Sequence, residues 1–258
     1  LKKAITLLEE AKKPMFLIGG GVNLAHAQQE MTKLAEKIDA PVITTVMGRG
    51  AISTEHPLYI GNIGMHGSYA ANKTADECDL MFSIGCRFND RVTGEIKKFA
   101  PNAKIVHIDI DKNEINHKVK SDISICCDLK AFMHCFIREI KNSVMFPDYQ
   151  GWLKLLQTWK EKYSEQNLNG EGISPNWFIG QVGKLVEDNT IFTADVGQNQ
   201  MWVAQSLRLN VNKFRILNSG GLGAMGFSLP AGIGAYFSGL FSKVICFTGE
   251  VGGQAVLG

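Results

Sequence analysis

The feature that most constrains this chain is a repeated alternation of short apolar runs with stretches of helical periodicity. The apolar runs of its first half comprise residues 15–18, 42–45, 80–84, 104–110 and 123–126. Continuous apolar runs of this length are typical of strands that are buried on both faces of a parallel sheet. Helical patterns are predicted over 2–12, 25–38 and 129–141, with Asp128 placed to cap the last of them.

The second half repeats the alternation after a stretch around Pro147 that lacks periodicity. Ser174 and Pro175 predict a helix start, because serine caps the free amides and proline suits the first helical position. The further elements expected are a helix over 152–163, strands at 190–194, 214–217 and 243–247, and helices from residues 198 and 226. The pattern predicts an α/β fold class with two doubly wound parallel-sheet (Rossmann-like) domains, at 1–142 and 152–258, joined by a linker at 143–151. Because the chain starts at Leu1 and stops soon after a strand, we expect both ends to be cut and the second domain to be truncated.

Composition excludes several classes of protein. Hydrophobic residues make up 45% of the 258 residues, which is enough to bury a core and excludes disorder as the main state. A net charge of +2 gives no field suited to nucleic acid or an anionic membrane, and no apolar run approaches the roughly 20 residues that span a bilayer. Six cysteines without a C-x-x-C pair, and no secretory signal, indicate a reducing compartment, either a bacterial cytoplasm or an organelle.

Glycine-rich strings follow the strands of the first domain. Gly19, Gly20 and Gly21 lie between a strand and a helix, where backbone amides can approach a phosphate, although a tight turn without a ligand is equally common. The run 85–94 places Arg87 and Arg91 at a strand end, where α/β sheets bind ligands; an exposed charged loop is the alternative.

Further polar groups stand at other strand ends. His66, within 64–67, is more often a satisfied turn histidine than a base. The carboxylates of Asp109 and Asp111 could accept hydrogen bonds from ribose or ribityl hydroxyls, or Asp111 could cap a helix. In the second domain, 195–200 and 219–226 are again strand-to-helix turns suited to phosphate, and Glu250 ends a strand where a cation could bridge to a diphosphate.

Taken in order, these strings resemble the large, catalytic subunit of acetohydroxyacid synthase (acetolactate synthase), a thiamine diphosphate enzyme. The resemblance rests on 64–67, 87–94, 107–111, 196–198, Met201, Trp202 and 219–230. It implies a central domain that holds flavin adenine dinucleotide (FAD), followed by a diphosphate-binding domain. It also implies condensation of two 2-keto acids, pyruvate with pyruvate or 2-ketobutyrate, with loss of CO₂. The family's members are expected to form homodimers or homotetramers when full length, possibly with a regulatory subunit.

The resemblance also assigns cofactor-binding residues. The FAD site would comprise Gly19, Gly20, Gly21, Thr45, Val46, Gly64, Met65, His66, Gly67, Gly85, Arg87, Arg91, Val92, Asp109, Ile110 and Asp128. Thiamine diphosphate, which needs Mg²⁺ in the full-length enzyme, would face Val196, Gly197, Gln198, Gly223 and Met225. No residue of this chain is assigned to catalysis or to metal binding.

Departures from the family pattern are equally informative. The family's activating glutamate belongs to a pyrimidine-binding domain that this sequence lacks, Asn199 replaces a histidine, and Gly249-Glu250-Val251 replaces Gly-Asp-Gly. No resemblance is visible over 251–258. We therefore expect the isolated chain to be inactive. Two alternatives stay open: another thiamine diphosphate oxidase, decarboxylase or carboligase, and a non-catalytic FAD- or nucleotide-binding module.

Overall fold

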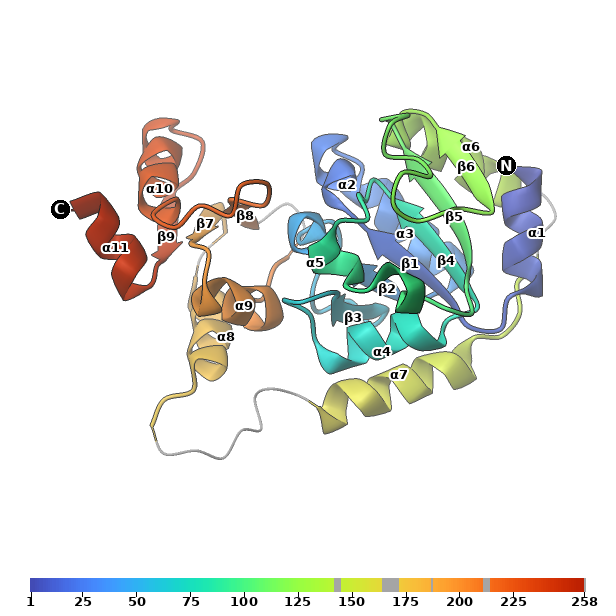
Figure 1. Ribbon diagram of the computed structural model, residues 1–258, viewed down its shortest axis with the longest axis horizontal. Coiled ribbons are helices and arrows are strands. Elements are labelled where there is room, and N and C mark those ends of the chain that lie inside the picture. The colour runs from blue at the N-terminus through green and yellow to red at the C-terminus, as the bar shows by residue number, and fades with distance from the viewer. Residues whose placement is uncertain (142–144, 164–171, 187, 211–213, 258) are drawn as a thin grey trace. The chain divides into compact units, whose positions relative to one another are not determined.

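Two separate parallel sheets organise the chain (Figure 1). The computed structural model describes residues 1–141, 145–163, 172–186, 188–210 and 214–257. One compact unit contains Leu1–Ile52 and His56–Tyr163, and the other contains Ser53–Glu55 and Ser164–Gly258. The α/β fold class with two parallel sheets, predicted from the alternating apolar runs, is confirmed.

The first unit is built on a six-stranded sheet in the order β3-β2-β1-β4-β5-β6. Its strands are β1 (Pro14–Ile18), β2 (Val42–Thr44), β3 (Tyr59–Asn62), β4 (Leu80–Ile84), β5 (Lys104–Asp109) and β6 (Ile123–Cys126). All pairs are parallel, and β1 and β4 are in register from Pro14 opposite Leu80 to Ile18 opposite Ile84. The strand order changes direction between β1 and β4, and this switch point opens a crevice at the carboxyl edge of such a sheet.

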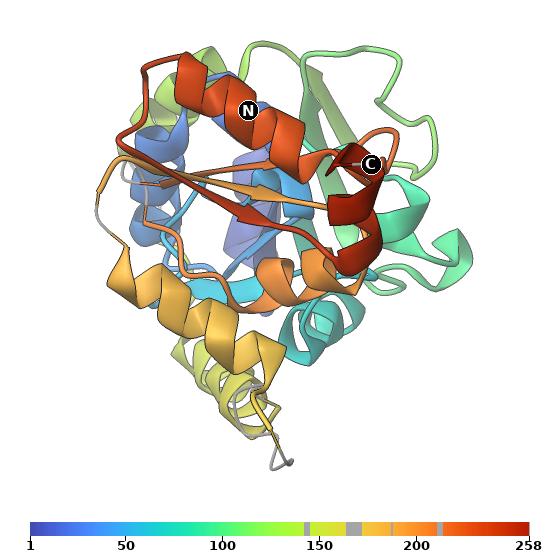
Figure 2. The same ribbon diagram turned by 90° about the vertical axis from the view of Figure 1, so that its left-hand side faces the viewer.

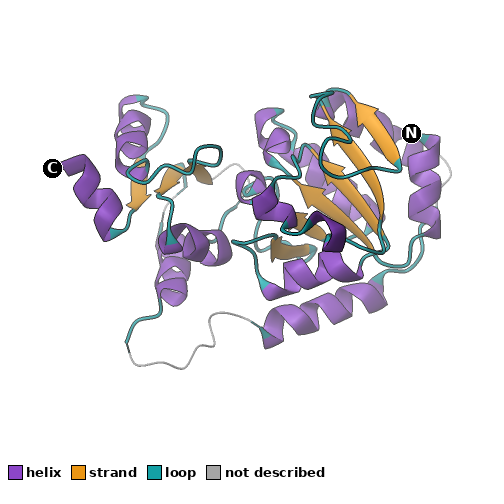
Figure 3. Ribbon diagram, in the orientation of Figure 1, coloured by secondary structure: helices purple, strands orange, loops and turns teal. Residues whose placement is uncertain are grey.

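Helices cover both faces of this sheet, as the secondary-structure colouring of Figure 3 makes visible. Alternate residues of β1 point to opposite faces, so Phe16 and Ile18 join one core cluster while Met15 and Leu17 join another. Helices α1 (Lys2–Glu10), α3 (Gln28–Ile38) and α6 (Leu129–Lys141) supply the first cluster. Helices α4 (Tyr69–Glu77) and α7 (Gln150–Lys162) supply the second.

The domain boundary differs from the one expected, because α7 belongs to the first unit and not to the second. Trp152 is buried and its indole nitrogen donates to the carbonyl of Pro14 at 3.1 Å, while the hydroxyl of Tyr149 donates to Leu8 at 2.7 Å. The amphipathic pattern predicted this helix, but only these long-range contacts show which core it covers. Residues 143 and 144 of the predicted linker lie outside the described residues.

Two local predictions in the first unit are wrong. The helix expected over 25–38 begins only at Gln28, because His26 has a φ of 51° that breaks the helical path; the separate short helix α2 (Gly20–Leu24) ends before it. Strand β3 was not predicted, since Gly61 shortens its apolar run and weakens the strand signal. The other strand predictions of this unit agree with the structure to within about a residue.

The second unit contains a three-stranded parallel sheet in the order β8-β7-β9. Its elements are α8 (Pro175–Leu185), β7 (Thr190–Ala194), α9 (Gln198–Ser206), β8 (Phe214–Asn218), α10 (Ser228–Phe237), β9 (Lys243–Phe247) and α11 (Glu250–Leu257). Figure 2 shows α8 and α10 on opposite sides of the strands. Phe192 and Ala194 pack with Ile179 of α8 and Val203 of α9, whereas Thr193 bonds Ser228 of α10 on the other face.

A serine cap and a glycine turn explain where two helices of this unit begin. Ser174 accepts a hydrogen bond from the amide of Trp177, which confirms the predicted start of α8. The helix expected from residue 226 begins at Ser228, because Gly226 has a φ of 81° that is incompatible with a helix. None of the helices in the described parts of the chain combines the length and apolar character needed to cross a bilayer.

Candidate functional site

The carboxyl ends of the first unit's strands bring the predicted FAD-site residues to one edge. Because all six strands are parallel, the segments that follow them emerge at the same edge of the sheet. These segments contain Gly19 to Gly21 after β1, Thr45 and Val46 after β2, Gly64 to Gly67 after β3, Gly85 and Arg87 after β4, Ile110 after β5 and Asp128 after β6, while Asp109 ends β5. The candidate residues of distant sequence segments therefore share one edge.

The glycines after β1 serve a different purpose from the one expected. The amide of Gly19 donates to the carbonyl of Ile84 at 3.0 Å, and the amide of Gly21 donates to Gly85 at 3.0 Å. A Cβ on Gly21 would lie 2.7 Å from the Cα of Gly85, so the two loops at the switch point touch through their backbones. Glycine is required here for loop packing, and these two amides are not available to a phosphate.

The turn after β3 rests on the short helix α5 (Asp90–Thr93). Gly64 has a φ of 88°, and a Cβ there would lie 2.9 Å from the Cα of Val92. The amide of Met65 donates to the carbonyl of Arg91 at 2.8 Å, and the guanidinium of Arg91 contacts the sulfur of Met65 at 3.2 Å. The structure thus joins Gly64, Met65, Arg91 and Val92, which are separate in the sequence.

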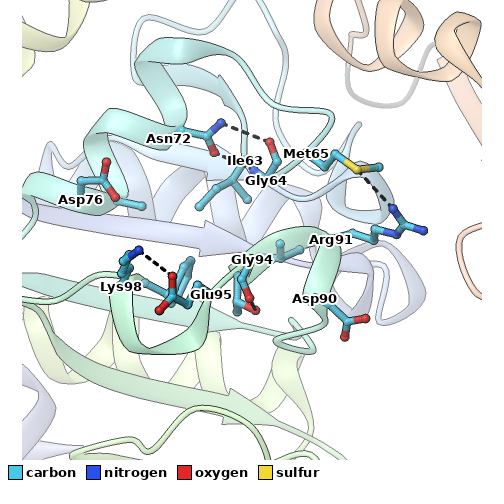
Figure 4. Close-up of a pocket in the computed structure, with 14 residues that line it drawn as sticks. Ile63, Gly64, Met65, Asn72, Asp76, Asp90, Arg91, Gly94, Glu95 and Lys98 are labelled. Atoms are coloured by element: carbon cyan, nitrogen blue, oxygen red, sulfur yellow. Dashed lines mark hydrogen bonds and ion pairs between the residues drawn. The ribbon is translucent and has the colours of Figure 1, made fainter.

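A pocket of about 480 Å³ lies beside this junction (Figure 4). Its lining combines apolar side chains with polar groups, among them Ile63, Asn72, Arg91, Val92 and Phe99. Gly64 and Met65 contribute to the same wall. The pocket lies between α4, α5 and the turn after β3, and of the predicted FAD-site residues its lining includes Gly64, Met65, Arg91 and Val92.

Two arginines at this edge could bind an anionic group. Arg87 and Arg91 are exposed, and neither forms an ion pair with any residue that the structure describes. The adjacent carboxylate of Asp90 is engaged by Lys118, whose hydrogen bond lowers the pKa of Asp90. Since Lys118 occupies that carboxylate, the guanidinium of Arg91 has no ion pair among the described residues, and only its Nη1 is directed at the sulfur of Met65.

His107 anchors the loop that carries Arg87. The imidazole is fully buried, its Nε2 lies 3.1 Å from the carbonyl of Cys86, and its ring meets that of Phe88 edge-on at 4.9 Å. Burial lowers the pKa of His107, against an opposing attraction from Asp109, so the ring is neutral at pH 7. A neutral ring can donate from Nε2 to the Cys86 carbonyl and hold the start of the loop.

Two predicted carboxylates are partly occupied by their own backbone. Asp109 is buried and one of its oxygens accepts from the amide of Asp111 at 2.9 Å. Asp128 accepts from the amide of Ala131 at 2.8 Å, which confirms its predicted capping of α6. Each carboxylate retains a second oxygen that could accept a hydroxyl.

In the second unit, a buried carboxylate organises the corresponding edge. One oxygen of Asp195 accepts from the amide of Ser228 at 2.9 Å and the other accepts from the hydroxyl of Thr248 at 2.8 Å. Asn199 donates to the carbonyls of Asp195 at 2.9 Å and Phe247 at 3.3 Å, which ties the ends of β7 and β9 together. These bonds fix the turn that precedes α9.

The residues predicted to face thiamine diphosphate lie at this edge. Val196 and Gly197 precede α9 and Gln198 is its first residue, while Gly223 and Met225 belong to the loop that follows β8. Met225 is 55% exposed. Strands β7 and β8 are parallel neighbours, so both groups of residues emerge on the same side of the sheet.

The described residues offer little for a metal ion. Glu250, the first residue of α11, is exposed, and both oxygens of Asp195 are already hydrogen-bonded. Within the described parts of the chain, no group of three or more His, Cys, Asp or Glu side chains is arranged to hold a metal. Glu250 is therefore the carboxylate at this edge that is left for Mg²⁺.

Comparison with known proteins identifies the family. The model of the thiamine pyrophosphate enzyme central domain matches residues 1–136, more than half of the chain. The chain belongs to the thiamine pyrophosphate enzyme family. The family's C-terminal domain, described as the TPP-binding domain, matches residues 195–258. Thiamine pyrophosphate and thiamine diphosphate are the same cofactor.

Several relatives of this thiamine pyrophosphate enzyme are acetolactate synthase large subunits. The chain is 42% identical over 98% of its length to a probable acetolactate synthase large subunit of Methanococcus aeolicus. It is 37% identical to the large subunit of Cyanidium caldarium and 39% identical to that of Lactococcus lactis, again over 98% of this chain. In each case it spans 44% of the relative's length.

The comparisons also correct one expectation. Residues 251–258 were expected to fall outside the family resemblance, yet the C-terminal domain model of this thiamine pyrophosphate enzyme family extends to residue 258. In the structure residues 251–257 belong to α11, where a Cβ on Gly252 would meet the carboxylate of Asp195. The segment is therefore packed against the candidate site.

Sequence reasoning missed three residues that shape these edges. Asn72 and Asp195 act through bonds to residues 8 to 53 positions away, and His107 acts through a carbonyl 21 positions away. His107 and Asp195 stand in strand-end motifs, which is a signal that could have found them. Asn72 lies inside α4 and has no such signal.

Proposed function

We propose that the first unit binds FAD at the carboxyl edge of its sheet. The observation that carries this proposal is Arg91, an exposed guanidinium without an ion-pair partner among the described residues, fixed beside Met65 at a pocket of about 480 Å³. An unpaired arginine at a strand end is suited to grip diphosphate oxygens through two charge-assisted hydrogen bonds. Arg87 offers a second guanidinium after β4.

The donor set fits a dinucleotide with a flat aromatic ring. Arg87 and Arg91 would hold the diphosphate, and the free oxygen of Asp109 would accept a ribityl or ribose hydroxyl. Met65 and Val92 offer apolar surface to a ring next to the pocket. The 2-keto acid condensation transfers no net electrons, so the flavin would supply binding energy and shape at this site.

For the whole protein we propose acetolactate synthase activity. A large subunit of this kind would condense pyruvate with pyruvate or 2-ketobutyrate, with loss of CO₂, in branched-chain amino-acid biosynthesis. Support comes from the similarity to acetolactate synthase large subunits over 98% of this chain. A homodimer or homotetramer, possibly with a regulatory subunit, and a bacterial cytoplasmic or organellar location belong to the same proposal.

In the second unit, Val196, Gly197 and Gln198 would hold thiamine diphosphate at the start of α9, with Gly223 and Met225 facing it. When bound, this cofactor supplies the carbanion that attacks the keto acid. The protein's part is to orient it: Asp195 and Asn199 fix the turn before α9 through the bonds described above. Met225 presents exposed apolar surface.

Mg²⁺ fits the described residues poorly. It is usually held by one or two carboxylates together with phosphates and water, and among the residues that the structure describes Glu250 is the one carboxylate at this edge without a hydrogen-bond partner. We therefore expect this chain to bind thiamine diphosphate weakly and to be inactive alone. The same observation favours the second candidate, an FAD-binding module without catalysis.

Titration of the chain with FAD, followed by quenching of flavin fluorescence, tests the proposal. Losing a charge-assisted contact costs about 1.5–3 kcal/mol, so Arg91→Ala should weaken binding roughly tenfold to a hundredfold. Arg91→Lys should restore only part of the affinity, since lysine cannot form the bidentate contact. Arg138→Ala, an exposed change late in α6, is the matched control. Equal affinities for all four proteins, or no binding by any of them, would reject the site.

A further inference from the structure

Asn72 makes a pair of hydrogen bonds that no predicted site residue explains. Its side-chain oxygen accepts from the amide of Gly64 at 2.8 Å, and its side-chain nitrogen donates to the carbonyl of Gly64 at 3.1 Å (Figure 4). One carboxamide thus satisfies both backbone groups of a single residue. The orientation of the amide is fixed, because a flipped amide would set donor against donor and acceptor against acceptor.

The bonded glycine is the most constrained point of the turn after β3. Gly64 has a φ of 88° and lies against the backbone of Arg91 and Val92, where a Cβ would collide. The next residue, Met65, donates its amide to the carbonyl of Arg91 at 2.8 Å. A shift of Gly64 would therefore break the bond from the Met65 amide to the Arg91 carbonyl and change the position of the Arg91 side chain.

Asn72 is held firmly enough to act as a support. It lies in the first turn of α4, a helix capped by Ser68, and its own amide donates to the carbonyl of Ser68 at 3.1 Å. Ala71 and Thr74 of the same helix are buried in the core. The carboxamide therefore projects from a rigid element onto a loop, which is how precise ligand sites are supported.

We propose that Asn72 is a positioning residue of the flavin site, which clamps the backbone of Gly64 and so holds Met65 and Arg91 in their binding arrangement. This inference rests on the proposed binding of FAD by the first unit. Asn72 itself need not touch the flavin. Its removal should lower flavin affinity by more than it lowers the stability of the fold.

The Asn72→Asp variant separates positioning from general stabilisation. An ionised carboxylate can still accept from the Gly64 amide but cannot donate to the Gly64 carbonyl, which it repels. A protonated carboxyl regains a donor, so acid should restore the clamp in this variant alone. The titratable groups that line the same pocket are Asp76, Asp90, Arg91, Glu95 and Lys98, and they are identical in both proteins.

The experiment measures flavin affinity of the whole 258-residue chain by fluorescence quenching from pH 8 to pH 4, a range that reaches the ordinary aspartate pKa of about 3.9, with melting temperatures at each pH. We expect Asn72→Ala and Asn72→Asp to bind FAD about tenfold more weakly than wild type at pH 8. The deficit of Asn72→Asp relative to wild type should shrink as the pH falls, whereas that of Asn72→Ala should not. Asn102→Asp, which adds the same charge at an exposed position before β5, should bind like wild type.

The outcomes distinguish the two proposals. If wild type does not bind FAD, the proposed function fails, and this inference fails with it. If wild type binds FAD and both Asn72 variants bind it as tightly as wild type does, only the positioning role is overturned. Variants that are unfolded at pH 8, or a deficit of Asn72→Asp that does not change with pH, would likewise overturn it, because Asn72 would then serve general stability.

Discussion

The two units of this chain share one pattern of alternating strands and helices but differ in how completely they cover their sheets. The central strands β1 and β7 are fully buried in both units, but the edge strands differ. Edge strand β3 of the first unit is fully buried, whereas no residue of β9 in the second unit, or of β6 in the first, is buried. In the second unit Leu222 is 96% exposed and Phe237 is 80% exposed. A sheet whose faces are covered within one chain can hold its edge loops rigidly. The comparison indicates that the loops at the carboxyl edge of a sheet are held in place for a ligand only where helices cover the faces of that sheet.

The carboxyl edges of the two sheets also differ in the charged groups that they leave for a ligand. In the first unit a free guanidinium, Arg91, and a fixed turn stand beside a pocket. In the second unit the carboxylate of Asp195 is consumed by Ser228 and Thr248, and Glu250 is the carboxylate left over. On the proposed function, we expect the first unit to bind its ligand more readily than the second.

The largest expected effect concerns two tryptophans that differ in burial. Trp152 is 5% exposed and hydrogen-bonded to Pro14, while Trp177 of α8 is 48% exposed. Trp152→Ala should destabilise the first unit by about 3–5 kcal/mol, because it removes a buried ring and opens a cavity. Trp177→Ala should change the stability of the second unit by about 1 kcal/mol or less.

Urea unfolding followed by circular dichroism and by hydrogen exchange of peptides from each unit measures both changes. A loss of less than about 1 kcal/mol for Trp152→Ala would mean that α7 does not belong to the first core. Equal losses for the two variants would remove the contrast between a covered sheet and an uncovered one.

A smaller effect is expected from pH, and it should be confined to the first unit. The pKa of His107 is lowered in the folded state by burial, so the unfolded chain binds the proton more readily. Stability contributed by neutral His107 is therefore complete well above the ordinary pKa of 6.5 and is lost as the pH falls below it. Asp109 and Glu114 are the titratable groups whose charges act on this ring, and the backbone carbonyl of Cys86 is its hydrogen-bond partner.

His107→Gln keeps a donor for the carbonyl of Cys86 but cannot titrate. The free energy of unfolding of this variant should fall less steeply between pH 7 and pH 5 than that of wild type. It is measured by urea unfolding of the whole chain, with hydrogen exchange of peptides from β4 and β5 to report on the first unit. Identical slopes for the two proteins would show that His107 is not the group responsible. An equal pH dependence of stability in peptides of the second unit would also show that His107 is not the group responsible.

Much of this fold could be predicted because its signals are local. The apolar runs of β4 and β7 identify strands directly, and Asp128 and Ser174 mark helix starts through bonds to residues three positions away. The edge of the sheet that collects the site follows from strand direction alone. Strand β3 could not be predicted, since glycine interrupts its short apolar run.

What could not be predicted depends on contacts between distant segments. The amphipathic pattern of α7 shows that it covers a core but does not say which one, and the bond from Trp152 to Pro14 spans 138 residues. The glycines after β1 lie at the predicted edge, but the sequence did not show that the amides of Gly19 and Gly21 bond β4 and the loop after it. Asn72 was invisible because its role depends on the path of the turn at Gly64.

Hydrogen exchange of the whole chain, with FAD and with thiamine diphosphate plus Mg²⁺ at equal concentrations, tests the central claim most directly. The account predicts that FAD slows exchange in peptides covering 63–67 and 85–93 of the first unit. Thiamine diphosphate with Mg²⁺ should leave peptides covering 195–199 and 249–253 of the second unit unchanged. Protection of the second unit by thiamine diphosphate, without protection of the first unit by FAD, would contradict it.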